Sequence, residues 1–231
     1  KNFRNEIYSE YKGNRSDAPD DLIPQFEYIR QSVKAFNLPS IELINYEADD
    51  LIATYVEKIL DLGAKVTIVS SDKDLMQLYK KGVRIYDPMK NKFINQDDVH
   101  NKFGVTPEKV IDVQSLAGDS TDNVPGVPGI GVKTAAELIN QYGTLENLLK
   151  NASKIKQNKR RETLINNKDD AIISKKLVTL KKDVPVKNKI EEFILKSVDQ
   201  DKLYTFLREM EFNRLLSLSL IHISEPTRLQ Q

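Results

Sequence analysis

Acidic side chains suited to metal binding occur in three clusters along the sequence. Carboxylates gathered in one place repel one another unless cations neutralise them. Sites made only of oxygen ligands select hard ions such as Mg²⁺ or Mn²⁺, and two such ions roughly 4 Å apart favour in-line attack on a phosphodiester. If the clusters meet in space, they predict a two-metal site for phosphodiester chemistry. The acids are Glu47, Asp49 and Asp50 in "NYEADD", Asp72 and Asp74 in "SSDKD", and Asp119 and Asp122 in "GDSTD".

Each cluster also has a simpler interpretation as a helix cap. Asp72 or Asp74 could cap the helix that follows them, and Glu47 would favour a helix N-terminus. Capping explains one cluster well, but it explains three clusters at strand ends poorly. We therefore favour the metal site and keep capping as the alternative.

A glycine-rich turn, "GVPGIGVKT" at 126–134, follows the third acidic cluster directly. It is not a nucleotide-binding P-loop, because Val132 stands where the lysine should follow the glycine. A tight turn before a helix exposes backbone amides that can meet phosphate closely. An ordinary connector between helices is the alternative. The residues that we expect to contact a DNA backbone are Gly126, Gly129, Gly131, Lys133 and Thr134.

Composition excludes several classes of site and of protein. The chain has no cysteine and two histidines, which excludes a zinc–thiolate site and a histidine-based metal centre. No apolar run approaches the length of a membrane span and no signal peptide is visible, so we expect a soluble cytoplasmic protein with no membrane partner. We also expect a monomer.

The positive charge is concentrated in one part of the chain. The net charge is only +1, but residues 150–189 hold thirteen Lys or Arg against four acids, a local net of +9. A basic face separate from acidic clusters suits a polyanion that is gripped in one place and cleaved in another. Solvated helix faces are the alternative.

Hydrophobic periodicity predicts alternating strands and helices followed by a helical region. This order is typical of a parallel α/β sheet, in which ligands bind beyond the carboxyl ends of the strands. The first two acidic clusters should therefore converge on one edge of the sheet. The expected elements are helices at 20–38, 47–63 and from 72, strands at 40–46 and 65–71, an antiparallel pair at 83–88 and 92–96, and helices from about 96 onward.

Five ordered motifs resemble those of a known family, the 5′ nuclease domain of bacterial DNA polymerase I and the related flap endonucleases. The resemblance runs from Lys1 to about Leu216 and implies a parallel-sheet, PIN-like α/β domain with a C-terminal helix-hairpin-helix region. The motifs are "FRNEIYSEYKGNR", "NYEADDLIA", "SSDKDLMQL", "GDSTDNVPGVPGIGVKTA" and "LREMEFNRLL".

The resemblance also implies roles for particular residues. The seven acids match the family's ligands for two metal ions, and the hairpin at 126–134 matches the one that holds the duplex and binds K⁺ in relatives. The first motif matches the base of a helical arch that passes a 5′ single strand. There Arg4, Lys12 and Arg15 would meet phosphates, and Lys12 would stabilise charge in the transition state.

The activity implied is that of a structure-specific 5′-3′ exonuclease and flap endonuclease for primer removal and DNA repair. Its partners would be DNA with a 5′ flap, a nick or an RNA primer, and a fused polymerase domain. Two alternatives remain open: a non-catalytic DNA-binding module, and a ribonuclease of the PIN type, which would not need the hairpin.

Two details of the first motif can be interpreted from the residues alone. Arg4 and Arg15 would share a helix face if one helix ran through both, although Gly13 and Asn14 favour a break. Tyr11 and its neighbour Tyr8 either stack on an unpaired base or pack inside the protein.

We expect three parts in the chain: a metal-binding α/β part at 1–98, a helical DNA-binding region at 99–217, and a non-native tail at 218–231. "LSLIHISEPTR" in that tail resembles a translated sequencing adaptor, and a short native strand with a turn is the alternative. By the resemblance, two further strands, each ending in a metal-binding Asp, would precede this sequence. We therefore expect the chain alone to fold loosely and to cleave weakly.

Overall fold

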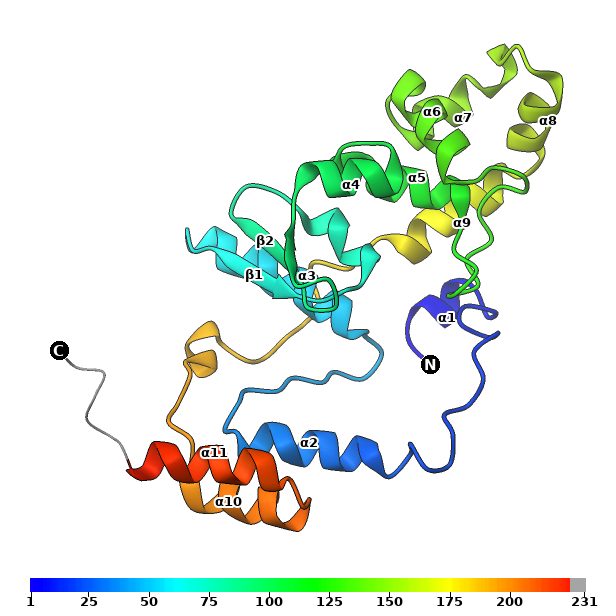
Figure 1. The fold of residues 1–231 in the computed structure, drawn as a ribbon. Helices are drawn as coiled ribbons and strands as arrows, with labels where there is room; N and C mark the ends of the chain where they lie inside the picture. The colour runs from blue at the N-terminus through cyan, green and yellow to red at the C-terminus, as the bar shows by residue number, and fades with distance from the viewer. Residues whose placement is uncertain (225–231) are drawn as a thin grey trace. The chain divides into compact units, whose positions relative to one another are not determined.

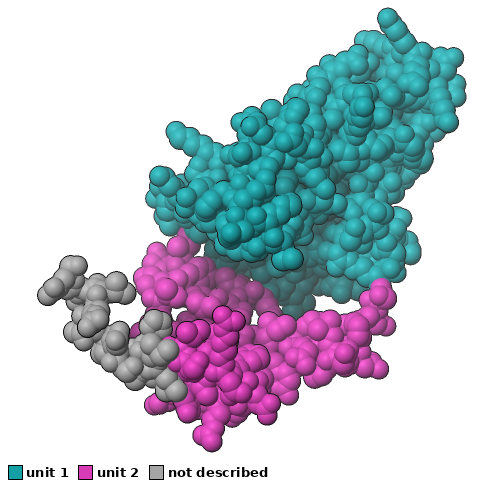
Figure 2. All heavy atoms as spheres, in the orientation of Figure 1, with its two compact units in different colours: residues 1–15, 43–186 teal, residues 16–42, 187–231 magenta. Residues whose placement is uncertain are grey.

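The computed structural model describes residues 1–224, with side chains to residue 218. A small sheet and many short helices make up the chain (Figure 1). It divides into two compact units, coloured teal and magenta in Figure 2. Unit 1 comprises residues 1–15 and 43–186, and unit 2 comprises residues 16–42 and 187–231.

The sheet of unit 1 has three strands in the order β1-β2-β3. β1 (Val66–Val69) pairs in parallel with β2 (Val83–Asp87), and β2 pairs antiparallel with β3 (Lys92–Ile94). Val83 and Ile85 point into the core and Arg84 between them is exposed, as the period of two in a strand requires. The strands predicted at 65–71, 83–88 and 92–96 are confirmed, and the last two form the expected antiparallel pair.

Each acidic cluster next to the sheet opens a helix. α3 (Ala48–Asp61) begins directly after Glu47 and buries Ala53 and Val56 against the sheet core. η1 (Lys73–Leu78), a 3-10 helix, begins after Asp72 and buries Leu75 and Leu78. The apolar spacing of these two segments therefore places their acids at helix N-termini.

The strand predicted at 40–46 is wrong. Among the described residues this segment forms one isolated bridge, between Asn45 and Asn2, and Ile44 is 88 % exposed. A strand is stabilised by a paired neighbour, and hydrophobic alternation alone does not supply one.

The helical part of unit 1 is arranged around α5 (Val110–Ala117). This helix packs against α6 (Val132–Tyr142) and α9 (Lys168–Val178), and its residues Val113 and Leu116 are fully buried. The expected helical region from residue 96 onward is thus confirmed. Its elements are α4 (Gln96–Phe103), η2 (Pro107–Lys109), α5 (Val110–Ala117), α6 (Val132–Tyr142), α7 (Leu145–Lys150), η3 (Ala152–Lys154), α8 (Asn158–Asn166) and α9 (Lys168–Val178).

The first motif forms only one short helix, α1 (Arg4–Ile7), followed by turns. Lys12 has a left-handed backbone, with φ of 57°, which a continuous helix does not allow. Arg4 and Arg15 consequently do not share a helix face. Tyr11 is buried against Val124 and Leu177, so the packing interpretation of this tyrosine is the right one.

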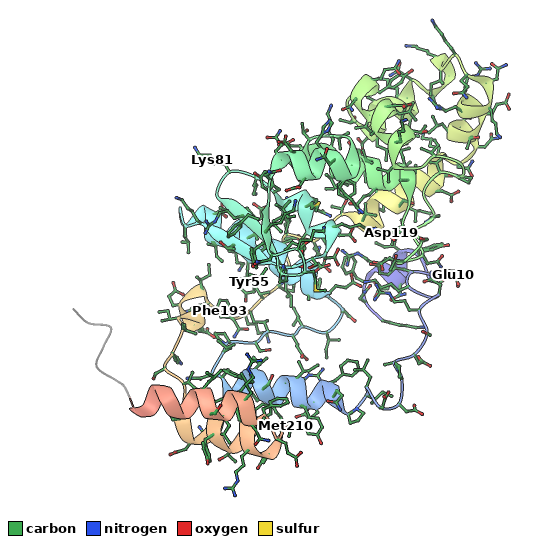
Figure 3. The ribbon with its side chains drawn as sticks, viewed as in Figure 1. Glu10, Tyr55, Lys81, Asp119, Phe193 and Met210 are labelled. Atoms are coloured by element: carbon green, nitrogen blue, oxygen red, sulfur yellow. The ribbon has the colours of Figure 1, made fainter. Side chains whose placement is uncertain are left out.

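Unit 2 has a small core of its own. Ala35 of α2 (Gln25–Ala35) packs with Leu203, Phe206 and Leu207 of α10 (Gln200–Glu209), and Met210, labelled in Figure 3, packs against them. The other elements are η4 (Ile190–Phe193) and α11 (Asn213–Ser224).

The tail predicted at 218–231 falls partly on α11. Because the helix runs through Ser224, a strand beginning at Leu218 is wrong. Residues 225–231 lie outside the described part of the chain, and the non-native origin of the tail stays a prediction.

Candidate active site

A pocket of about 130 Å³ in unit 1 brings the three acidic clusters together. Six of the seven predicted acids line it, and Asp50 is the one that does not. The three predicted cations Arg4, Lys12 and Arg15 line it too. The lining acids are Glu47, Asp49, Asp72, Asp74, Asp119 and Asp122.

Asp49 shows the effect of crowding the carboxylates together, because its pKa is raised. Burial, together with the carboxylates of Asp72, Glu47 and Asp74, raises the pKa of Asp49 to about 6. A carboxyl group with such a pKa binds a proton readily when no cation is near. The geometry therefore favours a cation at this position.

Lys12 and Arg15 form ion pairs with acids that line the pocket. The Lys12 ammonium donates to Glu47 and lies 3.4 Å from Asp122 Oδ2, and Arg15 Nη2 donates to Asp122 Oδ1 at 2.5 Å. The Tyr11 hydroxyl lies between the same two acids, 3.2 Å from Glu47 Oε2 and 3.3 Å from Asp122 Oδ2. Burial and the Glu47 carboxylate raise the pKa of Tyr11, so the phenol stays protonated.

Lys73 pairs with Asp119, the first acid of the third cluster. Its Nζ donates to Asp119 Oδ2 at 2.5 Å, and the backbone N–H of Thr121 donates to Asp119 Oδ1 at 2.8 Å. Burial alone would raise the pKa of Asp119, but these two donors hold it below its usual range. Asp119, labelled in Figure 3, lies in the loop between α5 and the glycine hairpin.

Asp72 and Asp74 are held by neutral groups. Asp72 Oδ1 accepts from the Asp74 backbone N–H at 2.9 Å, which makes Asp72 the cap of η1 as the alternative interpretation expected. Asp74 Oδ1 accepts from the side chain of Gln114 at 2.6 Å. Capping and pocket lining are therefore compatible in this cluster.

Arg4 lines the pocket but forms a buried pair with Asp50, which does not. Arg4 is 1 % exposed, and its two terminal nitrogens each donate to one oxygen of Asp50 at 2.7 Å. Its Nε donates to the carbonyl of Leu177 at 2.7 Å. This differs from the expected roles, because Arg4 has its donors engaged inside the protein and both oxygens of Asp50 are taken.

The carboxylate oxygens in the pocket are suitable ligands for a divalent cation, but their present positions do not form a coordination shell. In the part of the chain that the structure describes, no three His, Cys, Asp or Glu side chains stand in metal-holding geometry. The cations Lys12 and Lys73 contact the carboxylates instead. Because the acids offer carboxylate oxygens, the site suits a hard divalent cation.

The glycine hairpin is exposed at its tip and buried at its base. Gly129, Gly131 and Lys133 are exposed, and Gly131 directly precedes α6. Gly126 is buried, and its N–H donates to the hydroxyl of Ser174 at 2.9 Å. Gly126 is therefore turned inward, whereas Gly129 and Gly131 at the tip are exposed next to the N-terminus of α6. The contact of the hairpin with phosphate stays a prediction.

Comparison with known families assigns the chain. Residues 1–104 match the 5′-3′ exonuclease N-terminal resolvase-like domain, and residues 105–201 match the 5′-3′ exonuclease C-terminal SAM fold. The chain belongs to the 5′-3′ exonuclease family. A 5′-3′ exonuclease of Aquifex aeolicus is 41 % identical over 94 % of this chain and 73 % of its own length.

Two further relatives extend this assignment. DNA polymerase I of Rhizobium leguminosarum is 54 % identical over 93 % of this chain, which spans 21 % of that protein. A bacteriophage T5 flap endonuclease, solved as a pseudo-enzyme-product complex with DNA and metal ions, is 25 % identical and superposes with a TM-score of 0.69. That match covers 90 % of this chain and 78 % of the other. The predicted family and fold class are confirmed.

Sequence patterns missed Lys73, Tyr11 and Gln114 as neighbours of the acids. Lys73 stands between two predicted ligands, and Tyr11 directly precedes Lys12, so both had a signal in the adjacent sequence. Gln114 had none, since it is forty positions from Asp74 and only the fold brings them together.

Proposed function

We propose that this chain is the nuclease part of a structure-specific 5′-3′ exonuclease and flap endonuclease that hydrolyses DNA phosphodiesters with two divalent ions, Mg²⁺ or Mn²⁺. The observation that carries the proposal is the pocket in which six acids of the three clusters meet Lys12, Arg15 and Lys73. Membership of the 5′-3′ exonuclease family supports it. The reaction would serve primer removal and repair.

Two divalent ions, when bound, lower the pKa of the attacking water and stabilise charge on the leaving oxygen. We propose Glu47, Asp49, Asp72, Asp74, Asp119 and Asp122 as the residues that hold them. Asp50 then does not hold an ion but fixes the start of α3, because the Glu47 backbone N–H donates to Asp50 Oδ2 at 3.1 Å.

Lys12 and Arg15 would bind the substrate phosphate. Both lie at the pocket and both now pair with Asp122. A divalent ion would take over the neutralisation of that acid, which leaves the two side chains free to donate to phosphate oxygens. Such preorganised donors stabilise the charge that develops in the transition state.

The exposed hairpin tip would hold the duplex. Gly129 and Gly131 let phosphate approach the amides at the start of α6, and Lys133 adds a positive charge. Thr134 belongs to the first turn of the same helix, and main-chain carbonyls of the hairpin would take K⁺. These contacts read the DNA backbone and not the bases.

The remaining parts of the proposal concern the protein in the cell. We propose that it is monomeric and cytoplasmic, with a polymerase domain fused to it as in DNA polymerase I. The proposed division of the chain is a metal-binding part at 1–98 and a DNA-binding part at 99–217. No helix in the described residues is long and apolar enough to cross a membrane.

The test compares cleavage of 5′-flap DNA, linear duplex and single-stranded RNA, each with Mg²⁺ and with EDTA. We expect cleavage of the flap substrate that EDTA stops and that Asp119→Asn removes, and we expect Asp97→Asn on the exposed surface of α4 to leave it unchanged. Cleavage of RNA without flap DNA would favour the ribonuclease. DNA binding without metal binding or cleavage would favour the binding module.

A further inference from the structure

A buried glutamine contacts one of the pocket acids from outside the pocket. Gln114 of α5 is 4 % exposed and is not among the residues that line the pocket. Its Nε2 donates to Asp74 Oδ1 at 2.6 Å. The helix that carries Gln114, α5, is packed against both α6 and α9.

The other end of the same amide makes no hydrogen bond. Within the described residues, Gln114 Oε1 is buried and has no partner. A buried acceptor without a donor destabilises the folded state, and an apolar side chain of similar size would avoid that cost. Turning the amide over would bring Oε1 against an oxygen of Asp74, where two acceptors repel. The N–H that reaches Asp74 therefore accounts for a glutamine at this position.

Gln114 also differs from the charged partners of the other acids. Lys73 and Arg15 hold Asp119 and Asp122, but each also cancels a negative charge that would attract a cation. A neutral amide orients Asp74 and leaves its charge in place. This is the property that a carboxylate ligand needs from its neighbour.

We propose that Gln114 is a positioning residue that holds Asp74 in the orientation from which its carboxylate ligates a divalent ion. Hydrogen-bond partners of metal ligands typically contribute 10-fold to 100-fold to metal affinity or activity. The inference rests on the proposed function, in which Asp74 is a ligand. Gln114 itself touches neither the ion nor the DNA.

Two variants of the full chain test the hydrogen bond. Gln114→Met keeps the length and removes the donor, and Gln114→Asn keeps the amide but is too short to reach Asp74. Mn²⁺ binding is measured without DNA, by electron paramagnetic resonance of the free ion. We expect the dissociation constant to rise roughly 10-fold to 100-fold in both variants.

Ser115→Ala is the matched control. Ser115 is fully buried in the same helix, and its hydroxyl donates to the Ile111 carbonyl at 2.6 Å, away from the acids. We expect Mn²⁺ affinity to stay unchanged in this variant. In a cleavage assay, excess Mg²⁺ should restore the rate of the Gln114 variants, because affinity rather than chemistry is impaired.

The outcomes separate this inference from the proposed function. If the unaltered chain binds no Mn²⁺, the proposed function fails and the role of Gln114 falls with it. If the chain binds Mn²⁺ and the folded Gln114 variants bind it within threefold as tightly, only the role of Gln114 is overturned. It is also overturned if both variants lose cooperative thermal unfolding, because Gln114 would then be a structural residue.

Discussion

At the scale of single residues, the pocket balances two requirements. It must keep several carboxylates close enough to share cations, and it must remain folded when the cations are absent. Lys12, Arg15 and Lys73 meet the second requirement by pairing with Glu47, Asp122 and Asp119. Asp49 lacks comparable compensation, and the pKa of its carboxyl is raised to about 6.

Asp49→Asn should stabilise the metal-free protein at pH 8. The pKa of Asp49 is about 6 when folded against an ordinary value of 3.8, so between these values the folded state holds a proton that the unfolded state has lost. Stability therefore falls as pH rises through this window and stays lower above it. Asparagine does not ionise, so we expect a gain of about 1–2 kcal/mol at pH 8 after discounting for solvent screening, and none at pH 3.5.

Urea unfolding in EDTA at the two pH values measures this difference. Asp97→Asn, on the exposed surface of α4, is the control for loss of one negative charge. An equal gain in both variants would show that net charge, and not the crowding around Asp49, sets the effect.

Arg4→Met should destabilise the protein by about 3–5 kcal/mol, because it leaves the carboxylate of Asp50 buried and unpaired. The double variant Arg4→Met with Asp50→Leu should recover most of that loss, since no charge then remains buried. The exposed pair of Arg30 and Glu42 provides the control, and Arg30→Met should cost less than about 1 kcal/mol. Urea unfolding gives all three values.

The same double variant tests what Asp50 does. Asp50→Leu also removes the acceptor of the Glu47 backbone N–H. If Asp50 only fixes the start of α3, we therefore expect the folded double variant to bind Mn²⁺ more weakly than the unaltered chain but still to bind it. Loss of Mn²⁺ binding in a folded double variant would instead make Asp50 a ligand, as the resemblance implied.

The sequence predicted the acids well and their partners poorly. Asp119 and Glu47 belong to dense local clusters, and a cluster of like charges needs an explanation even before the fold is known. Arg4 illustrates the opposite case, because the resemblance of its motif to the family implied a role in phosphate binding. Its burial depends on the carbonyl of Leu177, which is 173 positions away and carries no signal in the sequence.

At the scale of elements, the sequence predicted correctly those elements whose stabilising features lie within their own segment. α3 has a regular apolar face and a reciprocal cap, and it lies where it was expected. The segment at 40–46 has strand-like alternation but, among the described residues, pairs only at Asn45. Alternation specifies which face is buried, whereas pairing depends on a partner elsewhere in the chain.

Two glycines of the hairpin are required for different reasons, and substituting each by alanine should give different losses of stability. Both have positive φ, 60° for Gly126 and 75° for Gly129. A Cβ on Gly126 would lie 2.4 Å from the backbone nitrogen of Gly118, whereas nothing lies within 4 Å of a Cβ on Gly129. We expect Gly129→Ala to cost about 1 kcal/mol, from backbone strain alone, and Gly126→Ala to cost upward of about 3 kcal/mol.

Thermal unfolding of the two variants gives the comparison. Equal losses would show that the backbones of Gly118 and Gly126 can separate without cost. In that case the loop that carries Asp119 would not depend on this close contact for its position.

At the scale of the whole molecule, the distribution of charge matters more than its sum. The net charge of +1 conceals the local net of +9 in residues 150–189. Part of that positive charge is used internally, because Lys175 pairs with Asp112 and Glu146, and Lys182 pairs with Glu57. The hairpin lysine Lys133 is exposed and is the better candidate for contact with DNA.

DNA affinity should fall steeply with salt and depend little on sequence, because the proposed contacts are to phosphates. Each lysine that contacts a phosphate adds about one to the slope of log affinity against log salt, so Lys133→Ala should lower the slope by about one. The control is Lys81→Ala, an exposed lysine before β2 that is labelled in Figure 3 and removes the same charge. Fluorescence anisotropy with a labelled duplex, in EDTA and at several salt concentrations, gives the slopes.

An unchanged slope in Lys133→Ala would exclude the hairpin lysine from the DNA contact. An equal reduction in both variants would mean that overall charge, rather than the hairpin, attracts the DNA.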